Sequence, residues 1–370
     1  MLVTVTGGSG FLGSHTVAEL VRRGHRVRLL ARSAARVDAA LGPLGVDRSA
    51  VRIARGDVTD AASVRRAVEG ADAVLHAAAV YSFDSRDRAR IRAVNAPGTA
   101  VVLEAAVRAG VPRVVHVSTV GALFPARGRE LSAASPVGTP RGAYLRGKAD
   151  AERVARSWQE RGAPVAISYP PALLGPHDPR LGDQTARLRA ALRGLMPVWP
   201  SGGFPVGDVR DTAAAHVRLL ERPPAPSSAP ERVFGPSRYL PTQEYLAVAR
   251  EVTGRRLPAL VLPARAVLPV GVAADLVQPA WPWHIPAEFG AVYTCAHAAP
   301  VAADADTCGV AARPVRETVA DTVRWLAAEG LLTRRQAGRA ARPTAVAADS
   351  AGAGAAGAEA AAFVPEGGEL

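Results

Sequence analysis

The chain contains little lysine, cysteine or aromatic residue for its length. Of the 45 basic residues among 370, Lys148 is the only lysine and the others are arginines. Aromatic residues make up 5% of the chain, so it lacks the stacking platforms with which proteins bind single-stranded nucleic acid. The two cysteines, Cys295 and Cys308, are too few for a disulfide framework and too isolated for a structural zinc site. We therefore expect neither a nucleic-acid partner nor a bound metal.

The net charge of +12 does not change this expectation, because the arginines are scattered along the chain among apolar residues. A long apolar run is also missing. The most apolar later stretch, residues 257–277, contains Pro258, Arg265 and Asp275, which makes it a poor membrane span. The N-terminus lacks the order of a signal peptide. We expect a cytoplasmic protein with no membrane partner.

Short apolar runs alternate with helical patterns through the first half of the chain. This alternation predicts a parallel sheet covered on both faces. The expected fold class is α/β, with a Rossmann-type doubly wound parallel sheet and a smaller C-terminal substrate lobe. The expected strands are 3–5, 26–31, 51–54, 73–76, 113–117 and 165–169, and the expected helices are 11–23, 91–109, 143–161, 212–220, 241–253 and 316–329.

The pattern loosens after Pro170, where prolines become frequent. We interpret residues 1–169 as a dinucleotide-binding domain to which residues 208–235 return. Residues 170–207 and 236–332 then form the substrate-binding lobe. Residues 338–370 are rich in alanine and glycine without an apolar face, which predicts a disordered tail.

Three glycines lie between the first strand and the first helix, at Gly7, Gly10 and Gly13. In this position they permit a tight turn, the approach of a pyrophosphate, and close packing of helix on strand. The N-terminal end of the helix, at Phe11 and Leu12, then faces the phosphates. The loop therefore predicts dinucleotide binding.

The acidic residue that would hold a ribose 2′-hydroxyl after the second strand is missing, and Arg32 stands near that position. An arginine suits a 2′-phosphate. This favours NADP as the cofactor, with NAD as the alternative, because Arg32 is also one arginine among many.

Tyr144 and Lys148 are four residues apart on a predicted helix and therefore share one face. A nearby ammonium stabilises a phenolate, so we expect Lys148 to lower the pKa of Tyr144 and to bind the nicotinamide ribose. A hydroxyl at the end of the fifth strand would hold the substrate oxygen. Ser118 and Thr119 are the two candidates, and we favour Thr119.

The chain carries several motifs in a fixed order. They are the Thr-Gly-Gly-Ser-Gly-Phe-Leu-Gly run at 6–13, Gly56-Asp57-Val58, His76-Ala77-Ala78-Ala79, Val94 to Thr99, Ser118-Thr119, Tyr144 with Lys148, and residues 207–213. Together these motifs resemble the extended short-chain dehydrogenase/reductase family, also called the NAD-dependent epimerase/dehydratase family, over about residues 1 to 332. The resemblance implies that Thr119, Tyr144 and Lys148 are catalytic, that Asn95 organises a water relay to the lysine, and that the enzyme forms a homodimer.

The resemblance also implies that Asp57 and Val58 flank the adenine and that Ala77, Ala78 and Ala79 line the cofactor, whose nicotinamide end lies near Pro170. Departures from the family pattern reduce the number of activities that we expect of this chain. Val120 and Gly121 replace the Asp-Glu of nucleotide-sugar dehydratases, and Phe204 replaces the arginine with which epimerases grip a diphosphate. The sixth strand ends Tyr169-Pro170 instead of Arg-Pro, which puts the local support of the nicotinamide in doubt.

The sequence thus predicts an NADP(H)-dependent oxidoreductase that interconverts a carbonyl and a secondary alcohol on a moderately apolar small molecule. It would resemble the dihydroflavonol-reductase-like branch or a hydroxysteroid dehydrogenase. One alternative is a nucleotide-sugar 4-epimerase with bound NAD, and another is a non-catalytic dinucleotide-sensing protein. We interpret His177-Asp178 as a turn, and His76 and His116 as buried histidines with hydrogen-bond partners. Trp281, Trp283 and His284 are equally compatible with a pocket wall and with ordinary packing.

Overall fold

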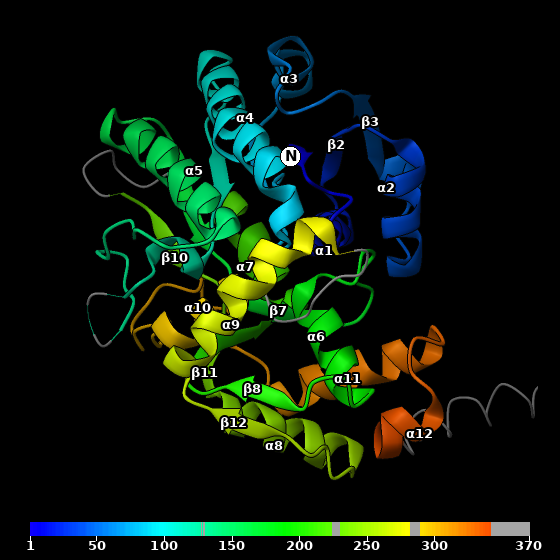
Figure 1. The fold of residues 1–370 in the computed structure, drawn as a ribbon. Helices are drawn as coiled ribbons and strands as arrows, with labels where there is room; N and C mark the ends of the chain where they lie inside the picture. Colours follow the sequence, from blue (N-terminus) through cyan, green and yellow to red (C-terminus); the bar gives the residue numbers. More distant parts are fainter. Residues whose placement is uncertain (127, 129, 224–229, 282–288, 342–370) are drawn as a thin grey trace, which may run out of the picture.

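The computed structural model describes residues 1–126, 128, 130–223, 230–281 and 289–341. A parallel sheet flanked by helices lies above a smaller lobe of short strands and helices (Figure 1). Trp283, His284 and residues 342–370 of the expected tail lie outside the described residues.

Seven parallel strands form the central sheet, in the order β3-β2-β1-β4-β5-β6-β10. Successive strands are added in one direction from β1 and in the opposite direction from β4. In open α/β sheets, ligands bind at the switch point between two such strands. The α/β fold of Rossmann type predicted from the sequence is confirmed. The strands are β1 (Leu2–Thr6), β2 (Arg26–Ala31), β3 (Val51–Arg55), β4 (Ala73–His76), β5 (Val114–Val117), β6 (Val165–Tyr169) and β10 (Arg232–Phe234).

Helices cover both faces of this sheet, as a parallel sheet requires. On one face α1 (Phe11–Arg22) packs against α2 (Ala34–Leu41) and α7 (Val209–Glu221). On the other face α4 (Arg88–Arg108) packs between α3 (Ala61–Val68) and α5 (Ala143–Glu160) (Figure 1).

Side-chain caps fix where several of these helices begin. Asp60 accepts hydrogen bonds from the backbone N–H groups of Ala62 and Ser63 at the start of α3. Asp208 accepts one from Arg210 at the start of α7. The first helix differs, because its N-cap is Gly10 and no side chain caps the N–H groups of its first turn.

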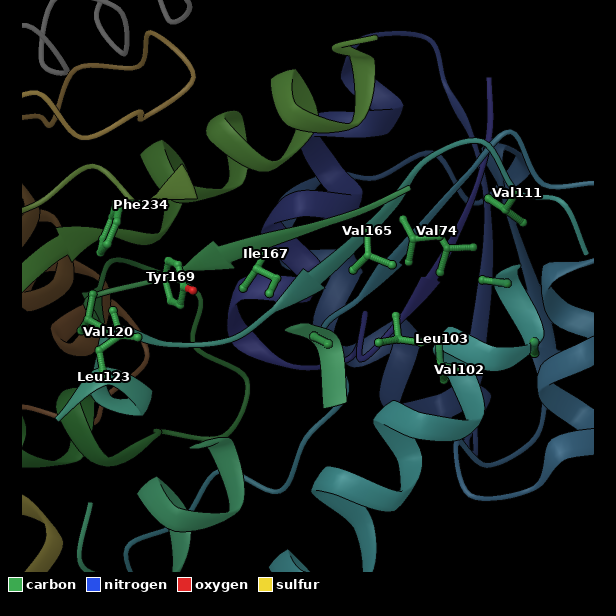
Figure 2. Packing of buried hydrophobic residues seen from close by; sticks show 14 of the residues in the cluster. Val74, Val102, Leu103, Val111, Val120, Leu123, Val165, Ile167, Tyr169 and Phe234 are labelled. Atoms are coloured by element: carbon green, nitrogen blue, oxygen red, sulfur yellow. The ribbon is translucent and has the colours of Figure 1, made fainter. Parts of the chain in front are cut away.

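Two apolar layers enclose the sheet. The layer beneath α4 and α5 contains Val74, Leu103, Val165, Ile167 and Tyr169 (Figure 2). The layer beneath α1 and α7 includes Val5, Val17 and Leu219. Burial of these branched side chains supplies the main driving force that fixes the strand ends where the cavity opens.

The lobe is built on a second small sheet of order β11-β9-β7 and a strand pair β12-β8. Its core holds Leu188, Trp199, Tyr245 and Val319. The strands are β7 (Ala172–Leu174), β8 (Val198–Pro200), β9 (Gly203–Asp208), β11 (Arg238–Pro241) and β12 (Leu260–Leu262), and the helices are α6 (Asp183–Leu192), α8 (Thr242–Thr253), α9 (Ala264–Val277), α10 (Phe289–His297), α11 (Val315–Ala328) and α12 (Arg334–Ala337).

Short 3₁₀ turns join several of these elements. The last of them, η6 (Gly338–Ala341), packs with Ala340 in the lobe core, so the first residues of the expected tail are part of the folded lobe. The others are η1 (Gly42–Leu44), η2 (Arg48–Ala50), η3 (Ser85–Asp87), η4 (Val120–Leu123) and η5 (Gln278–Ala280). Across the described ranges, every helix is too short or too polar to cross a membrane.

Candidate active site

One large cavity of about 670 Å³ opens at the carboxyl ends of β1, β4, β5 and β6, between the central sheet and the lobe. Thr119 lines it, together with every residue predicted to hold the cofactor. These are Gly7, Gly10, Phe11, Leu12, Gly13, Arg32, Asp57, Val58, Ala77, Ala78, Ala79, Tyr144, Lys148 and Pro170. Of the predicted site residues, only Asn95 is not among the residues that line the cavity.

The glycine loop forms a cradle that larger residues would block. Gly7 has a φ of +81°, and a Cβ on it would lie 2.6 Å from the backbone of Ala77 and Ala78. A Cβ on Gly13 would lie 2.2 Å from the carbonyl oxygen of Gly7, so α1 approaches β1 only because Gly13 has no side chain. Since the first turn of α1 has no side-chain cap, its N–H groups remain available to a phosphate. The loop therefore fits a dinucleotide pyrophosphate.

Arg32 lies at the far end of this groove, beside Asp57. Its Nη1 is 3.5 Å from Asp57 Oδ2, and the side chain of Arg32 is 53% exposed. Burial acts to raise the pKa of Asp57, but hydrogen bonds from Thr59 and the charge of Arg32 outweigh it and lower that pKa. Asp57 is thus an ionised carboxylate that already accepts hydrogen bonds from Thr59. The guanidinium of Arg32 faces the cavity and is partly exposed.

Tyr144 lies in the first turn of α5 and points into an aromatic corner. Its ring packs edge-on against Tyr81, with centroids 4.9 Å apart, and against Phe83, with centroids 5.3 Å apart. Burial raises the pKa of the Tyr144 phenol above its ordinary value, and the Asp183 carboxylate raises it further. At neutral pH the group is therefore a protonated phenol.

Lys148 is one turn further along α5 and is buried. Its Nζ donates a hydrogen bond of 2.6 Å to the carbonyl oxygen of Val117. Burial lowers the pKa of Lys148 to about 8, and the Glu152 carboxylate opposes that change. The lowering of the Tyr144 pKa predicted from this lysine is not found, because desolvation of the phenol dominates and the ammonium is directed at Val117.

Thr119 and Ser118 follow β5 and differ in where their hydroxyls lie. Thr119 Oγ1 accepts from the N–H of Gly121 at 3.3 Å and lies 3.4 Å from the carbonyl oxygen of Pro170. Ser118 Oγ is buried and has no hydrogen-bond partner within the described residues. Both residues line the cavity, but the Ser118 hydroxyl is buried, so Thr119 remains the favoured candidate to touch a substrate.

Asn95 lies on α4 with its side chain buried. Its Oδ1 accepts from the N–H of Val80 at 2.8 Å, and its Nδ2 donates to the carbonyl oxygen of Val80 at 3.3 Å. These two bonds hold the segment that follows β4, next to the aromatic corner. The water relay to Lys148 stays a prediction for this residue.

The two strand-end histidines differ from each other. His76 is buried between Thr6 Oγ1 at 2.8 Å and Thr99 Oγ1 at 3.0 Å, as predicted. The prediction for His116 is wrong, because neither of its ring nitrogens has a hydrogen-bond partner in the described parts of the chain. Burial lowers the pKa of both histidines, so both are neutral.

The lobe supplies an opposite wall that sequence reasoning did not assign. This wall is mostly apolar, although Asp183 and Arg187 of α6 line it and the charge of Asp183 acts on Tyr144. The only sequence signal for it was the apolar residue at Phe204. Its apolar members are Met196, Val198, Trp199, Phe204, Val267, Val270 and Val292, and Tyr81 and Phe83 continue it on the sheet side.

Of the other sequence candidates, Asp178 and Cys295 line the cavity, whereas His177 and Cys308 do not. His177 has a φ of 59°, and Asp178 accepts from Gly182 N and Thr185 Oγ1, which makes this pair a turn as predicted. Trp281 is 47% exposed and is not among the cavity-lining residues. Cys295 and Cys308 are free thiols. In the ranges that the structure describes, no three His, Cys, Asp or Glu residues are grouped as metal ligands would be.

Comparison with known families gives a direct match over most of this site. Residues 3–232 match the NAD dependent epimerase/dehydratase family, a stretch that contains the glycine loop, Thr119, Tyr144 and Lys148. The chain belongs to this family. It is accordingly an NAD(P)-dependent enzyme of the extended short-chain dehydrogenase/reductase type.

Two curated proteins are similar to this chain in sequence. Sterol demethylase protein B of Methylococcus capsulatus is 33% identical over 287 residues, which cover 75% of this chain and 82% of that protein. Cinnamoyl-CoA reductase 1 of Oryza sativa subsp. japonica is 34% identical over 236 residues, which cover 60% of this chain and 69% of that protein.

Among solved structures of the family, UDP-glucose 4-epimerase from Bifidobacterium longum, in complex with NAD+ and UDP, has the same fold. It superposes with a TM-score of 0.68 over 89% of this chain and 99% of that chain. Its sequence identity is 18%, so this likeness concerns the fold alone.

Proposed function

We propose that this enzyme is an NADP(H)-dependent oxidoreductase that interconverts a carbonyl and a secondary alcohol on a moderately apolar small molecule. One observation carries the proposal. Tyr144, a protonated phenol, stands where the glycine-lined groove meets the apolar wall of the lobe. A proton donor at that junction serves a reaction between a dinucleotide and an apolar carbonyl compound.

In reduction, Tyr144 donates its proton to the carbonyl oxygen as that oxygen gains charge. The Thr119 hydroxyl gives the same oxygen a hydrogen bond, for which its long contact with Pro170 is easily exchanged. Lys148 binds ribose hydroxyls with the donors that Val117 does not use. The bound cofactor supplies the hydride, or accepts it in the reverse direction.

The preference for NADP rests on Arg32. Its guanidinium lines the groove and is half exposed, which suits a bidentate contact to a 2′-phosphate. Arg90 and Arg180 line the same cavity, and the charges of Arg32, Arg36 and Arg90 act on Arg180. Such a cluster of like charges is relieved by an added dianion, which NADP carries and NAD does not.

The substrate class rests on the lobe wall. Phe204 is buried in β9 and faces the cavity where the epimerases of the resemblance carry an arginine. An apolar ketone or aldehyde fits this wall, in keeping with the sterol and the cinnamoyl group that appear in the names of two relatives. The nucleotide-sugar 4-epimerase alternative would place a diphosphate against Phe204 without its charged partner.

A panel assay tests the proposal. Purified protein is incubated with NADPH or NADH and with aromatic aldehydes, steroid ketones and flavonoid ketones, and coenzyme oxidation is followed by absorbance. We expect NADPH oxidation that depends on an apolar carbonyl compound. Interconversion of UDP-glucose and UDP-galactose without such activity would favour the epimerase. Coenzyme binding with no turnover on any substrate would favour a dinucleotide sensor, although a sensor has no need of Tyr144 and Lys148.

A further inference from the structure

The row of polar side chains on α5 continues past the catalytic pair. Tyr144, Lys148, Glu152 and Arg156 follow one another at four-residue intervals, so each lies one turn beyond the last on the same side of the helix. Glu152 is fully buried, although no part of it lines the cavity. A buried carboxylate is stable only with compensating partners, so the groups around Glu152 indicate what it does.

Three groups determine the environment of Glu152. Its Oε1 accepts from Arg156 Nε at 2.8 Å and from the Tyr169 hydroxyl at 2.6 Å. Its Oε2 is buried and has no hydrogen-bond partner within the described residues. Arg156 also donates to the Tyr169 hydroxyl at 3.0 Å, which closes a three-membered network. One oxygen of the carboxylate is thus fixed in place while the other remains free of hydrogen bonds.

We propose that Glu152 is a positioning residue for Lys148. Its buried carboxylate is the counter-charge of the chain's only lysine, and Arg156 and Tyr169 hold that carboxylate in place one helical turn from Lys148. The inference rests on the proposed role of Lys148, but the network itself is independent of any substrate.

The groups that face Lys148 from other elements support this assignment. His76 of β4 and His116 of β5 both interact with the lysine charge, and burial keeps both rings neutral. They therefore provide no negative charge. Glu152 is the acidic group that acts on Lys148 and raises its pKa against the effect of burial. Arg232 of β10 faces the far side of the network, where it interacts with Glu152 and Tyr169.

The same network ties α5 to the end of β6. Tyr169 is the last residue of β6 and packs beside Phe234, with ring centroids 4.9 Å apart (Figure 2). The next residue, Pro170, lines the cavity, and its carbonyl accepts from the N–H of Val120. This explains how the strand end is supported without the Arg-Pro ending of the family pattern. Tyr169 points into the protein, and Arg156 supplies the guanidinium from α5.

The sole lysine makes the proposal directly measurable. Protein labelled with ¹³C-lysine gives a single ε-CH₂ signal, whose chemical shift follows the charge of Lys148 with pH. In the wild-type chain we expect a pKa of about 8. In Glu152→Gln, which keeps the shape and removes the charge, we expect that pKa to fall by about one unit or more.

Asp150→Asn is the matched control. Asp150 is closer to Lys148 in sequence, but its side chain is 49% exposed and paired with Arg153, so we expect the Lys148 pKa to stay within about 0.3 units. Arg156→Gln should shift the pKa of Lys148 in the opposite direction. It removes a cation that competes for Glu152, so the pKa of Lys148 should rise by about half a unit.

Opposite shifts in Glu152→Gln and Arg156→Gln support the proposal, because general destabilisation of α5 would not produce both. An unchanged Lys148 pKa in both variants overturns it. If Glu152→Gln does not fold, Arg156→Gln alone decides, since a pKa that falls or stays constant there contradicts the proposal. These readings need no substrate, so they remain valid even if the panel assay finds no reductase activity.

Discussion

The ammonium of Lys148 donates to the carbonyl oxygen of Val117 across 2.6 Å, so the end of β5 and the first turns of α5 are joined at a buried charge. Thr119 follows that carbonyl by two residues, and Tyr144 precedes the ammonium by one helical turn. The contact therefore fixes two catalytic candidates relative to each other. It also makes the charge of Lys148 sensitive to pH.

The buried lysine predicts an alkaline limit to activity. Burial lowers the pKa of Lys148 to about 8, so its charged form is present below that pH and is lost above it. We expect kcat/KM to fall as the pH rises through about 8. Lys148→Arg keeps its charge over this range. That variant should be less active, but its kcat/KM should not fall as the pH rises through about 8. A wild-type profile that is flat to pH 10 would contradict the assignment.

The same group predicts how stability changes with pH. Between about 8 and the ordinary lysine pKa of 10.5, the unfolded chain binds a proton that the folded chain does not. The contribution of Lys148 to the free energy of unfolding therefore rises with pH across this window. Urea denaturation of the wild type and of Lys148→Met at several pH values measures it. As the pH rises, the free energy of unfolding of the wild type should increase relative to that of Lys148→Met.

The close approach of Gly13 to Gly7 predicts loss of cofactor binding in Gly13→Ala. The added Cβ would lie 2.2 Å from the Gly7 carbonyl oxygen, so either the loop or α1 must move. We expect the dissociation constant for NADPH, measured by fluorescence titration, to be at least about 100-fold larger than in the wild type. Gly42→Ala is the control, because nothing lies within 4 Å of a Cβ there. Equal affinity in the two variants would show that the loop does not hold the cofactor.

The exposed guanidinium of Arg32 predicts the coenzyme preference. Arg32→Ala should weaken NADPH binding about 10- to 100-fold, the usual value of a charge-assisted hydrogen bond, and leave NADH binding unchanged. Arg108→Ala removes an arginine that is 77% exposed on α4 and should alter neither. Isothermal titration of both coenzymes against the three proteins measures this. Parallel loss for NADPH and NADH in Arg32→Ala would remove the argument for a 2′-phosphate.

The wall provided by α9 predicts the substrate class. Val270 is 57% exposed and lines the cavity, so Val270→Asp places a charge beside the substrate without disturbing the core. We expect KM for an apolar ketone to rise about tenfold or more. Val272, on the same helix, is 46% exposed and is not a cavity-lining residue, so Val272→Asp is the matched control. Equal KM values for the two variants would place the substrate elsewhere.

The parts of the molecule that could be predicted from sequence are those with a strong local signal. The glycine loop, the strands from β1 to β6 and the Tyr144–Lys148 spacing are all local patterns, and the structure places them together at the strand ends. The lobe was harder, because its strands are short and its pairs join segments far apart in the chain, such as β8 with β12. Pro269 lies inside α9, where a proline normally predicts an interruption.

Two details of the site depended on burial, which spacing does not reveal. Spacing places Lys148 beside Tyr144, but the raised pKa of Tyr144 comes from Tyr81, Phe83 and the lobe closing over it. In the same way, His116 was expected to find a partner and has none within the described residues. Both outcomes depend on which residues surround a side chain in three dimensions.

The most direct test of the proposed mechanism compares wild-type protein with Tyr144→Phe in NADPH-dependent reduction of the best carbonyl substrate from the panel. The substitution removes one hydroxyl and keeps the ring that packs on Tyr81 and Phe83. We expect kcat to fall about 10²- to 10⁴-fold while NADPH affinity and Tm stay close to wild type. Full reductase activity in Tyr144→Phe would contradict the proposed mechanism.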